Sequence, residues 1–271
     1  MAQTLRVNGY DMSYVERGEG VPLLLIHGTL CDYRYWTAQM EPLGRGRRVI
    51  AVSLRHCYPE RWDGASDDFT ITQHGADVGA FIAALDAGPV HLLGHSRGGR
   101  VAFDVARNFP DRVSSLILAD PGGELDESLR PRGEAPPART ALWECGQLVK
   151  QGEIDRGLEK FIELISRPGI WSAMPEPAKN MLRDNARTLI GQIAASPEPF
   201  SRQAVAAIAA PTLLLIGERS PAFFYQIADA LVPHLRDGRR AIIERAGHAM
   251  SVENPAGFNA AVTEFLAARA G

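Results

Sequence analysis

Short apolar runs and longer amphipathic segments alternate along most of the chain. Residues 4–17 alternate apolar and polar side chains about Asn8-Gly9, a dipeptide that tolerates the positive φ of a tight turn, which predicts a β-hairpin. Residues 73–87 carry apolar side chains at i, i+3, i+4 and i+7, the spacing of an amphipathic helix. Because strands that alternate with helices are joined by right-handed crossovers, we expect a mostly parallel sheet. Its strands should occupy the continuous apolar run at residues 22–26 and the predominantly apolar segments at residues 49–52, 90–93, 113–119, 211–217 and 240–244.

This alternation stops in the middle of the chain, where no strand pattern is visible. Two apolar stripes at helical spacing, over residues 154–165 and 182–193, predict helices there. We therefore expect an α/β core domain formed by residues 1–122 and 203–271. Residues 123–202 should be inserted into it as a helical cap, or lid, over the edge of the sheet.

The apolar run at residues 90–93 leads into a Gly-x-Ser-x-Gly motif, Gly-His-Ser-Arg-Gly at residues 94–98. Glycines two residues on either side of a serine let the backbone turn sharply from strand to helix, which exposes the Ser96 hydroxyl as a nucleophile. A serine hydroxyl needs a base within hydrogen-bond reach, and that base is oriented by a carboxylate. The candidate base is His248, because it lies in a loop after the last apolar run. A final helix should follow it, since Asn254 precedes a proline as a helix N-cap does.

Bulk properties narrow the class of protein and its partners. Among the 271 residues, 45% are hydrophobic and 23% charged, as in ordinary globular proteins, and a formal net charge of −3 favours neither a nucleic-acid nor a membrane partner. The three cysteines are far apart and form no Cys-x-x-Cys pair, which favours a reducing compartment over a disulfide framework or a metal site. No signal peptide is visible, and no apolar run is long enough to span a bilayer. We therefore expect a cytoplasmic protein; its oligomeric state cannot be read from the sequence.

Several motifs in a fixed order resemble those of the α/β-hydrolase family, in particular serine esterases and lactonases with a helical cap. The resemblance covers essentially the whole chain. It rests on His27-Gly28 after an early strand, the motif at residues 94–98, Pro211-Thr-Leu-Leu-Leu-Ile-Gly-Glu218, and Ala246-Gly-His-Ala249 ahead of the last helix.

The resemblance implies a fold and a set of roles. The fold would be a mostly parallel eight-stranded sheet flanked by helices, with an inserted helical cap. Ser96 would be the nucleophile and His248 the base. The oxyanion hole would use the backbone N–H of Arg97 and one from the loop after His27, for which Thr29 is the best candidate.

The carboxylate is where this sequence departs from the family. After the penultimate strand the family usually reads Gly-x-x-Asp, but residues 217–220 here are Gly-Glu-Arg-Ser, so Ser220 stands at the acid position. Asp120 is our preferred acid, because it ends the strand that follows the Ser96 helix and neighbouring parallel strands end at one edge of the sheet. The alternative interpretation of Asp120 is purely structural, because it begins Asp-Pro-Gly-Gly, a natural turn whose first position suits aspartate. Glu218 is the alternative acid, and the third possibility is a Ser–His dyad or another acid.

Aromatic and sulfur-containing side chains near the presumed oxyanion loop are candidates for the pocket lining, although ordinary packing explains them equally well. They are Cys31, Tyr35, Trp36, Tyr58 and Trp62.

The predicted function is hydrolysis of a small-molecule carboxylic ester, lactone or related acyl compound through an acyl-enzyme, with no cofactor or metal. The same Ser/His site also serves cofactor-free perhydrolases related to bacterial haloperoxidases, carbon–carbon bond hydrolases and hydroxynitrile lyases. A catalytically weak ligand-binding receptor of this fold is a further alternative, which the serine at position 220 favours.

Overall fold

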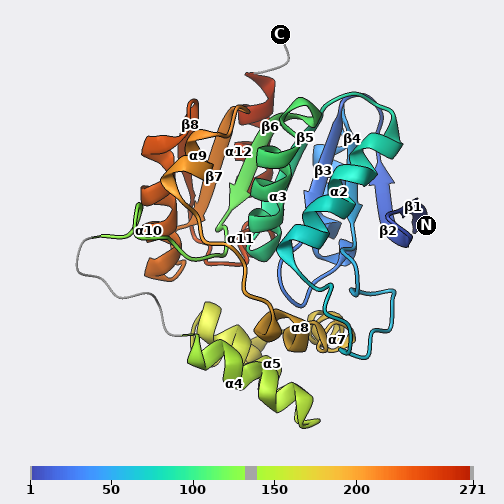
Figure 1. Ribbon diagram of the computed structural model, residues 1–271, viewed down its shortest axis with the longest axis vertical. Helices are drawn as coiled ribbons and strands as arrows, with labels where there is room; N and C mark the ends of the chain where they lie inside the picture. Colours follow the sequence, from blue (N-terminus) through green and yellow to red (C-terminus); the bar gives the residue numbers. More distant parts are fainter. Residues whose placement is uncertain (1, 132–138, 269–271) are drawn as a thin grey trace.

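An eight-stranded, mostly parallel sheet forms the centre of the protein (Figure 1). The computed structural model describes residues 2–131 and 139–268. The strand order is β1-β2-β4-β3-β5-β6-β7-β8; β2 pairs antiparallel with β1 and β4, and all other neighbours are parallel. The predicted α/β-hydrolase fold class is therefore confirmed. The strands are β1 (Gln3–Val7), β2 (Tyr10–Arg17), β3 (Pro22–Ile26), β4 (Arg48–Val52), β5 (Val90–His95), β6 (Val113–Ala119), β7 (Thr212–Gly217) and β8 (Gly238–Ile243).

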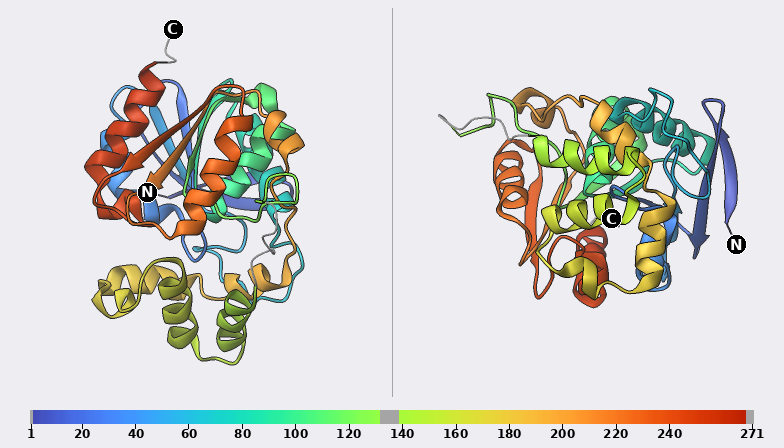
Figure 2. Two further views of the ribbon diagram at one scale, coloured as in Figure 1. Left: turned by 90° about the vertical axis from the view of Figure 1, so that its left-hand side faces the viewer. Right: turned by 90° about the horizontal axis from the view of Figure 1, so that it is seen from below.

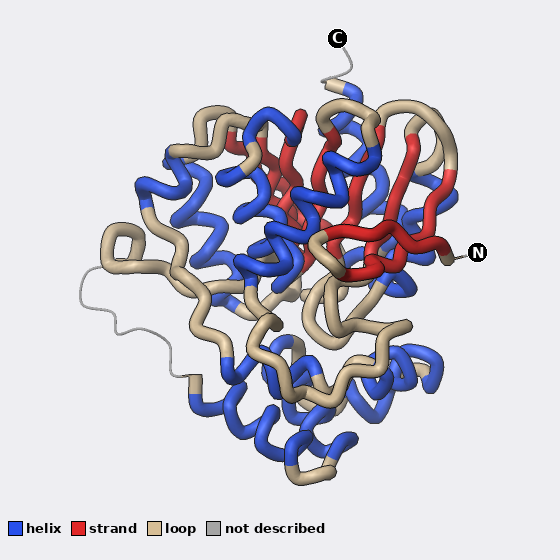
Figure 3. The backbone as a smooth tube through the Cα atoms, turned by 45° about the vertical axis from the view of Figure 1, so that its right-hand side comes forward, coloured by secondary structure: helices blue, strands red, loops and turns tan. Residues whose placement is uncertain are grey.

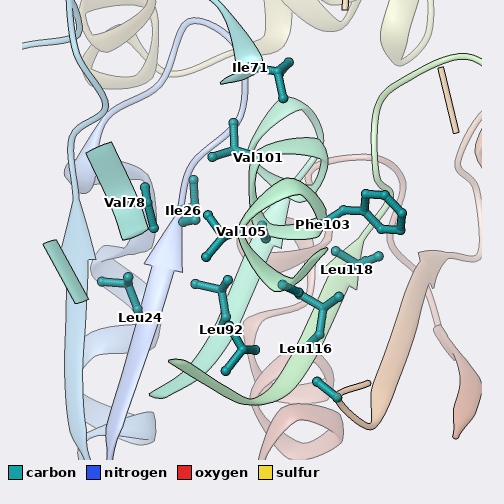
Figure 4. Close-up of a cluster of buried hydrophobic side chains, with 14 of the residues drawn as sticks. Leu24, Ile26, Ile71, Val78, Leu92, Val101, Phe103, Val105, Leu116 and Leu118 are labelled. Atoms are coloured by element: carbon teal, nitrogen blue, oxygen red, sulfur yellow. The ribbon is translucent and has the colours of Figure 1, made fainter. Parts of the chain in front are cut away.

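Helices cover both faces of the sheet, which explains why its central strands read as continuous apolar runs. Alternate residues of β3 face opposite sides: Leu24 and Ile26 belong to one core cluster, part of which Figure 4 shows, and Leu23 and Leu25 belong to the other. No helix in the described part of the chain is long and apolar enough to cross a membrane. The first face carries α2 (Ile71–Leu85), α3 (Arg97–Asn108), α9 (Arg202–Ala206) and α10 (Ala222–Leu231); the second carries α1 (Thr37–Leu43) and α12 (Pro255–Ala267).

Short helical turns complete the core. Asn254 caps α12 as expected, since its side chain accepts a hydrogen bond of 3.0 Å from the backbone N–H of Gly257. The remaining short elements are η1 (Tyr33–Trp36), η2 (Pro110–Arg112), η3 (Val232–His234) and α11 (Met250–Glu253).

A separate layer of helices lies beneath the sheet in Figure 1, and the side view of Figure 2 shows the same two-tier arrangement. One stripe predicted as a single helix is in fact two, α7 and α8. Asn185 stands at the break, where its side chain donates to the buried Asp32 at 2.7 Å and accepts from the backbone N–H of Tyr58 at 2.7 Å. These bonds tie the layer to the loops of the sheet. Its helices are α4 (Thr140–Lys150), α5 (Ile154–Ile165), α6 (Ile170–Ala173), α7 (Glu176–Asp184) and α8 (Thr188–Ala194).

The chain leaves the sheet for this layer and returns from it along two adjacent paths. Leu125, on the outward path, forms an isolated parallel bridge with Phe200 on the return path. The Phe200 N–H donates to the Glu124 carbonyl at 2.7 Å, and the Asp126 N–H donates to the Phe200 carbonyl at 2.9 Å. Figure 3 shows that loops join the sheet to the lower helices.

Candidate active site

Ser96 stands at a sharp turn between β5 and α3. Its backbone angles are φ 52° and ψ −123°, a combination that is strained for a residue with a side chain. A Cβ on Gly94 would lie 2.2 Å from the Gly98 carbonyl oxygen, and one on Gly98 would lie 2.3 Å from the His27 carbonyl oxygen. Both positions therefore require glycine, which is the physical reason for the Gly-x-Ser-x-Gly spacing.

His248 and Asp120 come together from two different loops. The Nδ1 of His248 lies 3.1 Å from Oδ2 of Asp120, and both side chains are buried. Asp120 follows β6 directly, and its N–H donates to the Leu215 carbonyl on β7 at 2.9 Å. His248 stacks on Phe224 with ring centroids 4.2 Å apart, and its carbonyl accepts a hydrogen bond of 2.8 Å from Nε2 of His95, the residue before Ser96.

One ring nitrogen of His248 contacts a carboxylate, and the other has no partner among the described residues. Nδ1 faces Asp120, whereas Nε2 is buried and has no hydrogen-bond partner among the described residues. A ring held at Nδ1 by a carboxylate presents Nε2 as a proton acceptor, which is what a general base requires.

Ser220 binds the same carboxylate oxygen as His248. Its hydroxyl donates to Oδ2 of Asp120 at 2.5 Å, and Ser220 is itself 8% exposed. Burial raises the pKa of Asp120 to about 7, and the Ser220 hydrogen bond opposes that rise. Burial likewise lowers the pKa of His248 to about 3. An isolated charge is therefore disfavoured here, and the hydrogen bonds that Asp120 accepts, that of Ser220 first among them, favour the charged carboxylate.

Glu218 lies elsewhere in the same loop. Its side chain is exposed, and its Oε2 accepts a hydrogen bond of 2.7 Å from the backbone N–H of Arg245. The structure thus pairs His248 with Asp120 and gives Glu218 a different partner. Sequence reasoning missed the contribution of Ser220, although a hydroxyl at the family's usual acid position was the available signal.

The two residues expected at the oxyanion hole line the same cavity as Ser96. Arg97 begins α3, so its backbone N–H is among the donors that a helix leaves free at its first turn. Thr29 lies after Gly28, where an added Cβ would come 3.0 Å from Cβ of Ser96. The Thr29 hydroxyl donates to Oε1 of Gln192 on α8 at 2.8 Å.

A cavity of about 470 Å³ opens beside Ser96, between the sheet and the helical layer. Among the described residues, no group of three or more His, Cys, Asp or Glu side chains is arranged to hold a metal ion. The lining includes Thr29, Ser96, Arg97, Arg100, Gly122, Leu125, Leu142, Phe161, Leu164, Gln192, Phe223 and Phe224.

The five side chains suggested from the sequence for the pocket do not line this cavity. Each packs elsewhere: Tyr35 stacks on His95 at 5.0 Å, Trp36 lies against Phe258 at 6.1 Å, and Cys31 is buried in the same cluster. Tyr58 lies under the Arg34 guanidinium, and Trp62 stacks on His56 at 4.4 Å. Proximity in sequence to the oxyanion loop did not predict which residues line the cavity, because segments that are distant in sequence form its walls.

The chain belongs to the alpha/beta hydrolase family, whose sequence profile matches residues 23–261. The resemblance seen in the motifs is thereby confirmed. A curated relative, "Putative 2-succinyl-6-hydroxy-2,4-cyclohexadiene-1-carboxylate synthase" of Bacillus subtilis (strain 168), is 27% identical over 263 residues, covering 90% of this chain and 89% of the relative.

Many solved structures share the fold, including an esterase and an enol-lactonase. A thermophilic esterase from Thermogutta terrifontis, with malate bound, has a TM-score of 0.79 at 24% identity and full coverage of both chains. The enol-lactonase from Burkholderia xenovorans LB400 has a TM-score of 0.78 at 18% identity, covering 98% of this chain and 100% of the other.

Proposed function

We propose that this protein is a serine hydrolase that cleaves a carboxylic ester, lactone or related acyl bond of a small molecule through an acyl-enzyme. The observation that carries the proposal is the buried contact of 3.1 Å between His248 and Asp120, packed against His95, the residue before the strained Ser96. A strained serine, a histidine with one free nitrogen and a buried carboxylate are the three parts that nucleophilic acyl transfer requires.

The reaction follows from these parts. Oγ of Ser96 attacks the substrate carbonyl carbon while its proton passes to Nε2 of His248, and the charge on the carbonyl oxygen is stabilised by the backbone N–H groups of Arg97 and Thr29. The imidazolium, balanced by Asp120, then gives its proton to the departing alcohol oxygen as the ester bond breaks. Water repeats the sequence on the acyl-enzyme, which releases the acid and restores Ser96.

Asp120 is favoured as the acid over Glu218. Its carboxylate is fully buried and within hydrogen-bond distance of His248, whereas Glu218 is exposed and bonded to a backbone N–H. The relatives support an acyl substrate in general terms, since the structures that share the fold include an esterase and an enol-lactonase.

Labelling by a fluorophosphonate probe tests the nucleophile. We expect the folded wild-type protein to be labelled at Ser96, as located by peptide mass spectrometry, and the Ser96→Ala variant to remain unlabelled. Absence of labelling in folded wild-type protein would overturn the proposal and favour the receptor alternative.

Paired substitutions test the acid. Asp120→Asn is expected to lower kcat by about 10⁴, as loss of the carboxylate does in comparable triads, whereas Glu218→Gln should retain near wild-type kcat. The opposite ranking would transfer the role to Glu218.

A further inference from the structure

Two arginines on the first turn of α3 line the cavity beside Ser96. Arg97 is 9% exposed and Arg100 is 3% exposed, so both guanidinium groups are taken out of water. Neither forms an ion pair with a carboxylate within the described ranges 2–131 and 139–268. Both guanidinium groups are therefore buried beside the proposed active site without a direct carboxylate partner.

The neighbours of Arg97 are neutral. Its Nη1 lies 2.8 Å from Nδ1 of His74, and its guanidinium lies 4.3 Å above the Phe69 ring. Burial lowers the pKa of His74 well below its usual value, so this histidine accepts a hydrogen bond without adding charge. Burial also lowers the pKa of Arg97, to about 10, which leaves Arg97 protonated at neutral pH.

Arg100 is even less well satisfied. Its Nη2 donates to the Glu198 carbonyl at 2.9 Å, while Nε and Nη1 are buried and have no hydrogen-bond partner among the described residues. The nearby carboxylates of Asp104 and Glu198 attract it, but both are bonded to Arg107, at 3.3 and 2.9 Å. Its guanidinium otherwise faces the rings of Phe103 and Phe200 at 5.2 and 4.8 Å.

Two other partly shielded arginines among the described residues have carboxylate partners, whereas Arg112 and Arg130 donate only to backbone carbonyls. Arg55 binds the buried Asp77 at 2.8 Å, and Arg34 binds the buried Asp32 at 2.7 Å. Because an unpaired buried charge is strongly destabilising, two such residues in the lining of one cavity call for a partner that the described residues do not supply.

Resting on the serine-hydrolase proposal, we propose that Arg97 and Arg100 bind a carboxylate carried by the substrate, so that the enzyme acts on anionic esters or lactones. A guanidinium forms strong, charge-assisted hydrogen bonds with a carboxylate. Apolar side chains such as Leu142, Phe161 and Phe223 also line the cavity, and a monoanionic carboxylate loses less hydration free energy on entering such a site than a dianionic phosphate does.

Matched esters that differ in one charge test this subsite. On the acyl side, methyl hydrogen adipate is compared with dimethyl adipate; on the alcohol side, 4-acetoxybenzoate is compared with 4-acetoxybenzamide. We expect the wild-type enzyme to prefer the charged member of at least one pair by about tenfold or more in kcat/KM, the size of effect expected for hydrogen bonds to a charged group. A wild-type enzyme that hydrolyses the neutral members equally well or better would overturn the subsite and leave the hydrolase proposal intact.

Substitution of Arg100 tests whether this residue is responsible for the preference for charged esters. Arg100→Met keeps an apolar stem of similar length against Phe103 and Phe200 and should reduce the charged-to-neutral ratio of kcat/KM by about tenfold to a hundredfold. Arg100→Lys, which keeps the charge without the planar fork, should give an intermediate ratio. Arg112→Gln is the control, because Arg112 likewise stacks on a ring, that of Phe109, and donates to one backbone carbonyl but does not line this cavity. A ratio that survives in Arg100→Met would refute the proposal.

Stability and binding separate a functional role from a structural one. If Arg100 is retained for substrate, Arg100→Met should leave Tm unchanged or higher; a fall of more than about 4 °C with an unchanged ratio would make the residue structural. Calorimetry with adipate and the Ser96→Ala protein gives a readout that needs no catalysis. Binding that weakens about tenfold in Ser96→Ala/Arg100→Met supports the subsite, and absence of binding to Ser96→Ala overturns it even if all esters are inert.

Discussion

Removal of the Ser220 hydroxyl is expected to shift the acidic limb of the pH–rate profile to higher pH. The hydroxyl donates to Oδ2 of Asp120 at 2.5 Å in a buried site, and only the ionised carboxylate benefits fully from that bond. A hydrogen bond to a charged group contributes about 1.5–3 kcal/mol, and one pKa unit corresponds to about 1.4 kcal/mol, so Ser220→Ala should raise the pKa of Asp120 by about one to two units.

The direction of this shift in the pH–rate profile follows from the role of the carboxylate. Burial already raises the pKa of Asp120 to about 7, so the ionised form that balances the His248 imidazolium predominates only above that pH. A further rise moves the onset of activity upward, while the plateau at high pH is largely retained. The assay is kcat/KM for an ester between about pH 5.5 and pH 9.5 at constant ionic strength, with enzyme stability verified at each pH.

Ser220→Thr is the matched control, because it keeps a hydroxyl at the same position and should keep the wild-type limb. A Ser220→Ala enzyme whose activity falls by one factor at every pH, with the limb unmoved, would refute the reasoning. Ser220 would then act through packing alone.

Three further substitutions test contacts in other parts of the structure as well as this one. Gly98→Ala should destabilise the protein by about 4 kcal/mol or more in urea unfolding, because its Cβ would lie 2.3 Å from the His27 carbonyl oxygen; a loss below about 1 kcal/mol would contradict this. In an Asp120→Asn background, Ser220→Asp should recover at least about tenfold in kcat, since the new carboxylate would approach the same histidine; no recovery would show that geometry forbids relocation. Burial alone would lower the pKa of His56, but its hydrogen bonds to Glu60 and Asp68 outweigh burial and raise the pKa. The difference in Tm between wild type and His56→Asn should therefore be largest below about pH 6.5 and should decrease as the pH rises through the raised pKa. A difference independent of pH would rule out that ion pairing.

Local sequence signals were sufficient for the strands and for the turn at Ser96. The predicted strands at residues 22–26 and 113–119 match β3 and β6 to the residue, because a strand that is buried on both faces is predominantly apolar. The proximity of Asp120 and His248 was also predictable, since parallel strands end at a common edge.

The cavity was not predictable in the same way. Its walls come from α3, α5 and α10 and from the connections around Gly122 and Pro197, which meet only after the helical layer has packed. The burial of Arg97 and Arg100 depends on those same connections, and arginine on an isolated amphipathic helix is normally exposed. Ser220 escaped notice because its partner lies 100 residues away in sequence, so no local pattern links the two.

The bridge between Leu125 and Phe200 has a consequence for how such chains diverge. β6 pairs directly with β7, and the outward and return paths meet at this bridge. No described residue between Leu125 and Phe200 is part of the sheet. The intervening segment can therefore lengthen, shorten or be exchanged for another without altering a strand register or moving Ser96, His248 or Asp120. Substitution or replacement of this segment can therefore change substrate specificity while the proposed catalytic residues keep their positions.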